Sequence, residues 1–91
     1  MYVILVYDIN TDDNGKVLGK IFKLCKKYLS HVQNSVFVGS LTNGELMRLK
    51  IDINRYLRND MDSVIIFKLA SQKQVDRELL GLQIDSTSTF L

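Results

Sequence analysis

The sequence predicts an α+β protein with a ferredoxin-like sandwich in the order β-α-β-β-α-β. Residues 2–8 and 63–70 are mostly apolar and rich in β-branched and aromatic side chains, which is typical of strands. Two stretches between them repeat apolar residues every three or four positions, as amphipathic helices do. A further strand-rich stretch, residues 31–41, separates the two helical patterns.

Length and composition favour one small domain over residues 1–91. With 46% apolar and 24% charged side chains, the composition excludes a disordered chain. No apolar run reaches the ~20 residues of a transmembrane helix, and residues 2–7 are too short for a signal-peptide core. The single cysteine excludes an internal disulfide framework and a thiolate-rich zinc site. We therefore expect a cytoplasmic protein.

The first half of the chain reads as a strand, a loop and a helix. The strand at residues 2–8 is followed by a polar loop at residues 10–15, and the apolar period of residues 16–29 predicts a helix. Its apolar stripe comprises Val17, Ile21, Leu24 and Tyr28, flanked by Leu18, Phe22, Cys25 and Leu29. Because Cys25 lies on this stripe, its position favours a core residue over a nucleophile.

The middle of the chain predicts further strand structure and a second helix. Residues 31–41 form either one bent strand or two strands that meet at a tight turn. Thr42 and Glu45 then fit a capping box, which opens a helix that runs to about Arg58. The expected buried stripe of this helix comprises Leu46, Leu49, Ile53, Tyr56 and Leu57.

The chain ends in a strand at residues 63–70 and a mostly polar tail. Within the tail we expect a short helix at about residues 73–80 and an extra C-terminal edge strand at residues 82–84. Residues 1–70 would then form the core of the domain, and residues 71–91 would contact a second copy or a partner.

Both faces of the predicted sheet need a cover. A sheet face open to water should alternate apolar and polar side chains, and neither residues 2–7 nor residues 64–67 alternate. A second copy of the chain in a two-fold dimer, or the tail of the same chain, could cover the second face. We favour the homodimer, because the polar tail supplies little apolar area.

The charge is unevenly distributed along the chain. Residues 14–58 hold nine basic residues against two acidic ones, a net +7, whereas the remaining residues carry a net −5. Such asymmetry indicates a surface that faces a polyanion, although lysines also simply solvate helix surfaces. The candidate nucleic-acid-binding residues are Lys16, Lys20, Lys23 and Lys27 on the first helix, with Arg48, Arg55 and Arg58 on the second. No base-reading motif is found, so binding should depend on backbone charge and on salt.

Asp8 is the candidate metal ligand and catalytic residue. It ends an apolar strand, where a carboxylate is costly to bury unless it is paired or bound to a metal. Asp12 and Asp13 follow, so up to three carboxylates could gather here, but these two are more typical of a loop and a helix cap than of metal ligands. Oxygen ligands suit Mg²⁺ or Mn²⁺, and a two-fold axis nearby would let two copies of Asp8 share one ion. His31 would carry protons only if it reached this site.

Three blocks of the sequence resemble the small CRISPR-associated nuclease family called Cas-two. They are Met1–Ile9, Val32–Phe37 and Asp62–Phe67, and they occur in order over residues 1–70. The most specific parts are the Tyr-Asp pair that ends the first strand and the Gln-x-Ser-Val-Phe sequence of the second block.

The resemblance implies a ferredoxin-like homodimer in which the Asp8 carboxylates of both copies bind Mg²⁺ for hydrolysis of RNA or duplex DNA. It also implies a partner, the CRISPR integrase, with which the dimer acts in spacer acquisition. Two alternatives to a metal-dependent endonuclease remain. One is a non-catalytic bridge that holds duplex DNA in the acquisition complex, and the other is a related ribonuclease toxin of the same fold.

Overall fold

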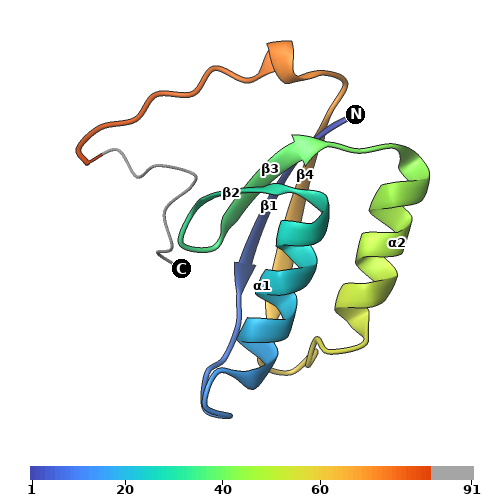
Figure 1. Cartoon of the computed structure of the whole chain (residues 1–91), viewed down its shortest axis with the longest axis vertical. Coiled ribbons are helices and arrows are strands. Elements are labelled where there is room, and N and C mark those ends of the chain that lie inside the picture. Colours follow the sequence, from blue (N-terminus) through green and yellow to red (C-terminus); the bar gives the residue numbers. More distant parts are fainter. Residues whose placement is uncertain (83–91) are drawn as a thin grey trace.

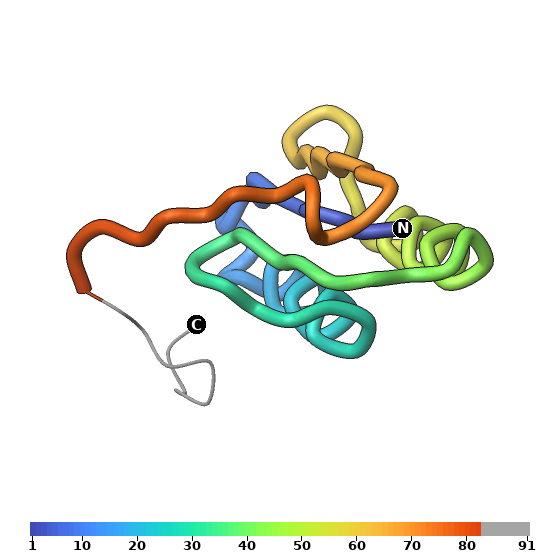
Figure 2. The backbone as a smooth tube through the Cα atoms, turned by 90° about the horizontal axis from the view of Figure 1, so that it is seen from above, coloured from blue at the N-terminus to red at the C-terminus, as the bar shows by residue number. Residues whose placement is uncertain are grey.

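The computed structural model describes residues 1–82 of the chain and shows two helices on one face of a four-stranded sheet (Figures 1 and 2). In chain order the elements are β1 (Tyr2–Asp8), α1 (Lys16–Tyr28), β2 (Ser30–Gln33), β3 (Val36–Ser40), α2 (Asn43–Asn54), β4 (Ser63–Leu69) and the 3₁₀ turn η1 (Gln72–Gln74). The strands are antiparallel in the order β2-β3-β1-β4. The expected β-α-β-β-α-β sandwich is therefore confirmed.

Strand β1 is the central element of the fold. It pairs with β3 from Tyr2 to Val6 and with β4 along its whole length, from Tyr2 to Asp8. Because side chains alternate along a strand, Val3, Leu5 and Tyr7 all point to the helices and are buried in the core. The intervening side chains, those of Ile4, Val6 and Asp8, point to the opposite face, which we call the open face.

The stretch at residues 31–41 forms two strands and not one bent strand. A tight turn at Asn34 and Ser35 joins β2 to β3, and Asn34 has a positive φ of 42°. Asparagine tolerates this left-handed region better than most residues, which explains its place in the turn. The pairing of the two strands is irregular between His31 and Gln33.

Helix α2 begins as predicted but ends early. Thr42 and Glu45 form both hydrogen bonds of the capping box, at 2.9 and 3.1 Å. The expected end at about Arg58 is wrong, because the helix stops at Asn54. The Asp62 carboxylate accepts the backbone N–H of Arg58 at 2.9 Å, which holds that residue in the connection to β4.

The tail differs most from the prediction. The expected helix at residues 73–80 is wrong: only Gln72–Gln74 forms a 3₁₀ turn, and residues 75–82 have no regular secondary structure. A helix of that length is marginal in water, and here the Gln74 side chain closes the turn by accepting the Ala70 backbone N–H at 2.8 Å. The expected edge strand at residues 82–84 lies outside the described residues, apart from Leu82.

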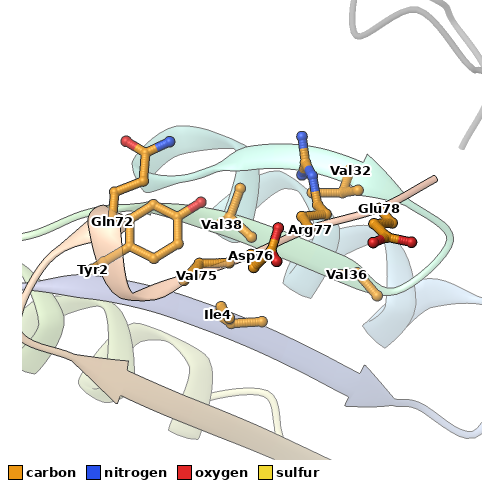
Figure 3. Close-up of a pocket in the computed structure, with 10 residues that line it drawn as sticks. All are labelled: Tyr2, Ile4, Val32, Val36, Val38, Gln72, Val75, Asp76, Arg77 and Glu78. Atoms are coloured by element: carbon orange, nitrogen blue, oxygen red, sulfur yellow. The ribbon is translucent and has the colours of Figure 1, made fainter.

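The tail covers one side of the open face. Residues from Gln72 to Glu78 run above β1, β3 and β2 and enclose a cavity of about 370 Å³ with side chains such as Ile4 and Val38 (Figure 3). On the β4 side, Ile65 and Phe67 remain 54% and 53% exposed. Within residues 1–82, the tail therefore covers only part of the apolar surface. Neither helix of this part of the chain is long and apolar enough to cross a membrane.

Candidate functional site

Asp8 lies at the end of the central strand, where backbone pairing fixes its position. It is paired with Ser63 of β4, and on the other side of the strand the Tyr7 N–H donates to the Ser35 carbonyl at 3.2 Å. Its carboxylate is exposed, in contrast to the buried residues Tyr7 and Ile9 on either side. Asp8 therefore combines a fixed backbone with a carboxylate that is accessible from solvent.

The other two carboxylates of this segment do not join Asp8. Within residues 1–82, no three His, Cys, Asp or Glu side chains gather closely enough to hold a metal ion, as the interpretation of Asp12 and Asp13 as loop and cap residues predicts. Asp13 accepts the backbone N–H groups of Gly15 at 3.0 Å and Val17 at 3.1 Å, which caps the start of α1. The hydrogen bond from Val17, aided by the charge of Arg58, lowers the pKa of Asp13. One chain thus offers Asp8 alone as a ligand.

A cluster of four residues holds the loop after Asp8 in place, and we call it the Arg58 clamp: Asn10, Asp13, Arg58 and Asp62. The guanidinium donates to the Asp62 carboxylate at 2.8 and 3.1 Å, to the Asn10 carbonyl at 2.8 Å and to Asp13 at 3.2 Å. The Asn10 N–H donates to Asp62 at 2.9 Å. The clamp therefore joins the β1–α1 loop to the α2–β4 connection.

Electrostatics inside the clamp are favourable for both ionised groups. The hydrogen bond from Arg58 is the largest effect that lowers the pKa of Asp62 to about 2, and the same contact raises the pKa of Arg58. The Asp62 side chain is fully buried, whereas that of Arg58 is 27% exposed. Arg58, expected among the phosphate-facing charges, is instead committed to the fold.

The remaining basic candidates are exposed on the two helices. Lys16, Lys20, Lys23 and Lys27 lie on α1, Arg48 lies on α2, and Arg55 directly follows the end of α2. The Lys20 ammonium lies 4.9 Å from the centre of the Tyr56 ring, and Arg55 lies 3.9 Å from Asp52. Their role in binding nucleic acid stays a prediction.

A cavity of about 700 Å³ lies beside Asp8, and we call it the Asp8 cavity. It is bounded by the end of β1, the first half of α1 and the β2–β3 turn. Its lining residues are Tyr7, Asp8, Ile9, Gly15, Leu18, Gly19, Phe22, Lys23, Asn34 and Ser35. Of the predicted site residues, the structure brings only Lys23 to this cavity together with Asp8.

Two other candidates have structural roles. Cys25 is fully buried, and burial raises the pKa of its thiol to about 12, which confirms it as a core residue. The Nε2 atom of His31 lies 2.8 Å from the Asn34 carbonyl, and its ring packs against Phe22 and Phe37. His31 is not among the residues that line the Asp8 cavity.

Known proteins resemble this chain over most of its length. The family model described as "CRISPR associated protein Cas2" matches residues 1–77. The CRISPR-associated endoribonuclease Cas2 of Fusobacterium nucleatum is 49% identical over 92 positions, covering 100% of this chain and 87% of that protein. A relative from Moorella thermoacetica, CRISPR-associated endoribonuclease Cas2 2, is 45% identical and covers 98% of this chain and 100% of that protein.

Two solved structures have the same fold as this chain. A crystal structure of cas2 superimposes with a TM-score of 0.82 at 33% identity, covering 100% of this chain and 98% of the other. The structure of Streptococcus pyogenes Cas2 at pH 6.5 gives a TM-score of 0.79 at 35% identity, covering 89% and 100%. The family model spans well over half of the chain, and the relatives exceed 40% identity over nearly all of it. The chain belongs to the CRISPR-associated Cas2 family.

Proposed function

We propose that the protein is a CRISPR-associated endoribonuclease that hydrolyses phosphodiester bonds at Asp8. The observation that carries this proposal is the exposed Asp8 carboxylate at the end of a strand paired on both sides, beside a cavity that also holds Lys23. The endoribonuclease names of the relatives from Fusobacterium nucleatum and Moorella thermoacetica support the same activity. Membership of the CRISPR family favours this function over a toxin.

The donor chemistry of Asp8 fits Mg²⁺ or Mn²⁺. Mg²⁺ retains several waters and binds through one or two carboxylates together with substrate phosphate, so a site with few protein ligands suits it. When bound, the ion would polarise the phosphate and lower the pKa of an attacking water. Asp8 supplies the carboxylate, and Lys23 supplies positive charge for the neighbouring phosphates.

A homodimer would complete the site. Ile65 and Phe67 leave an uncovered apolar surface on the same face of the sheet as Asp8. Pairing two such surfaces about a two-fold axis would bury these side chains, and it would bring the two Asp8 carboxylates to one interface. Each copy would then provide one of the ligands of a shared ion.

The test compares Asp8→Asn with Asp12→Asn, which neutralises an exposed carboxylate in the following loop. Labelled single-stranded RNA and duplex DNA are incubated with each protein in Mg²⁺ and in EDTA. We expect Asp8→Asn to lower RNA cleavage roughly 100-fold or more, as loss of a metal-site group does, and Asp12→Asn to cleave normally. Equal cleavage by wild type and Asp8→Asn would refute the proposal.

A second candidate function is a bridge that holds duplex DNA together with the CRISPR integrase. The observation that favours it is the set of exposed basic side chains on the helices, which cover the face of the sheet opposite the open face. Reversing Lys16 and Lys27 to Glu should weaken duplex binding and flatten its dependence on salt. If Asp8→Asn supports spacer acquisition and the lysine variants do not, the bridge is the biological function; the reverse result rejects it.

A further inference from the structure

The Asp8 cavity has the architecture of a small-molecule subsite. Its volume of about 700 Å³ lies within the range of ligand pockets. Apolar side chains form much of the lining, namely Tyr7, Ile9, Leu18 and Phe22. The polar groups come from a few residues, which is the usual arrangement where apolar area gives affinity and polar groups set orientation.

One face of α1, together with Gly15 just before the helix, supplies half of the lining. The helix residues recur at spacings of three and four, so they share one side of α1: Leu18, Gly19, Phe22 and Lys23. A Cβ atom built at Gly19 meets nothing within 4 Å, which means that the absence of a side chain there leaves the cavity wall open. Glycine inside a helix costs roughly 0.5–1 kcal/mol relative to alanine, so this residue is not explained by the stability of α1.

The Phe22 ring, which lines the cavity, is held in place by two neighbouring rings. The Phe22 ring packs edge-on against Phe37, with centroids 5.6 Å apart, and against His31, with centroids 5.1 Å apart. Both contacts restrict its rotation. A fixed aromatic side chain in an accessible cavity is a stacking platform for a planar ligand, and stacking on such side chains is how proteins hold unpaired bases.

The polar groups of the cavity match a nucleotide. Lys23 supplies a positive charge for a phosphate, and Asn34 offers both donors and an acceptor for the edge of a base. Asn34 is placed by the β2–β3 turn, where its own carbonyl lies 2.8 Å from the His31 ring nitrogen and its side chain is exposed. Asp8 is also a lining residue, so a base held here lies beside the strand end that carries the proposed cleavage site.

We propose that the Asp8 cavity binds one unpaired nucleobase of the RNA substrate, next to the phosphate that is cleaved at Asp8. This inference rests on the proposed endoribonuclease function and adds the place where one nucleotide of the RNA is held. A base within a duplex is stacked and paired, so it cannot enter a concave apolar cavity, whereas an unpaired base can be turned out into it.

The experiment uses Gly19→Leu to fill the cavity and Gly19→Ala as the matched control. Both substitutions favour the helix, and neither Cβ meets another atom, so the variants should unfold no more easily than wild type. Binding is measured in EDTA, which prevents cleavage, with a single-stranded RNA that contains one 2-aminopurine, a base analogue whose fluorescence is quenched when it stacks.

We expect Gly19→Leu to weaken single-stranded RNA binding about tenfold and to remove the quenching, as loss of one stacked base should. Gly19→Ala should bind nearly as wild type does. Replacing one base of the RNA by an abasic residue should weaken wild-type binding by a similar factor and leave Gly19→Leu unaffected. Wild-type affinity and quenching in Gly19→Leu would overturn the proposal, as would an equal loss of duplex binding.

A second variant, Asn34→Gly, keeps the positive φ of the turn and removes only the side-chain amide. We expect it to reduce the preference among the four bases without changing the salt dependence of binding. Unchanged base preference in this variant counts against the subsite.

The two proposals can fail separately. If wild type binds and quenches the RNA but never cleaves it, the endoribonuclease proposal fails and the base subsite stands. If RNA is cleaved at Asp8 and Gly19→Leu leaves that cleavage unchanged, the endoribonuclease stands and the base subsite fails. If binding of another protein protects the cavity residues and binding of RNA does not, the occupant of the cavity is not a nucleobase.

Discussion

The Arg58 clamp makes a quantitative prediction for Asp62→Asn. The Asp62 carboxylate accepts hydrogen bonds from the Asn10 N–H, from the Arg58 N–H and from two guanidinium nitrogens, all between 2.8 and 3.1 Å. An amide of the same shape keeps one acceptor oxygen and places an NH₂ group against donors. Hydrogen bonds to charged groups contribute about 1.5–3 kcal/mol each, so losing one or two of them at a buried position is a large perturbation for so small a domain.

The pKa of Asp62 gives an independent magnitude. It is lowered from 3.8 to about 2, and each pKa unit corresponds to about 1.4 kcal/mol, so the ionised carboxylate stabilises the fold by about 2 kcal/mol at neutral pH. Since the pKa in the folded state is below that of the unfolded chain, this contribution is present in full above about pH 4 and is lost as the pH falls through about 2. From the hydrogen bonds and from the pKa alike, we expect Asp62→Asn to lose about 2–3 kcal/mol at pH 7.

Urea denaturation at pH 7 and at several lower pH values tests this reasoning. The matched control is Asp60→Asn, which removes an exposed carboxylate from the same connection and should change the free energy of unfolding by no more than about 0.5 kcal/mol. All proteins are compared at equal concentration, because the proposed homodimer would make stability depend on concentration. The difference between wild type and Asp62→Asn should shrink as the pH falls from 4 towards 2. A difference below about 0.5 kcal/mol at pH 7, or one that does not change with pH, would refute the reasoning.

The remaining predictions concern the core and the open face. Cys25 is fully buried with a thiol pKa raised to about 12, so a thiol reagent at pH 8 should label it only as fast as the protein opens, and rapid labelling of the native protein would contradict its burial. Phe67→Glu places a charge on the uncovered apolar surface, so sedimentation should show a folded monomer, while Lys68→Glu, on an exposed neighbour, should remain dimeric. A wild-type monomer at micromolar concentration would rule out the homodimer.

Features that depend on nearby residues were predictable from the sequence. The capping box links Thr42 to Glu45 over a single helical turn, and the period of the apolar residues identified α1 to within one residue of its end at Tyr28. The strand at residues 2–8 was also predictable from neighbouring residues. Apolar side chains occupy both faces of this central strand, so they form a continuous apolar run in the sequence. The resemblance to the Cas-two family also pointed to Asp8.

Features that depend on residues far apart in the sequence were not predictable from it. The clamp connects Arg58 with Asp13 and Asn10, which are 45 and 48 positions away, and nothing local distinguishes Arg58 from the basic residues that remain exposed. The Asp8 cavity required the β2–β3 turn to meet α1, although Gly19 between Leu18 and Phe22 was a signal that one helix face lacks a side chain.

The clamp and the site depend on one another through the β1–α1 loop. Asp8 is held by strand pairing on its own side of this loop, whereas Gly15, on the far side, lines the Asp8 cavity and donates its N–H to Asp13 of the clamp. Loosening the clamp should therefore move one wall of the cavity and leave the carboxylate in place. A catalytic constellation tolerates little displacement, so Asp62→Asn should weaken RNA binding in EDTA even at temperatures where it is fully folded, while the proposed binding of Mg²⁺ at Asp8 should be unchanged. If Asp62→Asn loses RNA binding and Mg²⁺ binding together, the clamp supports the whole end of β1 and not only the wall of the cavity.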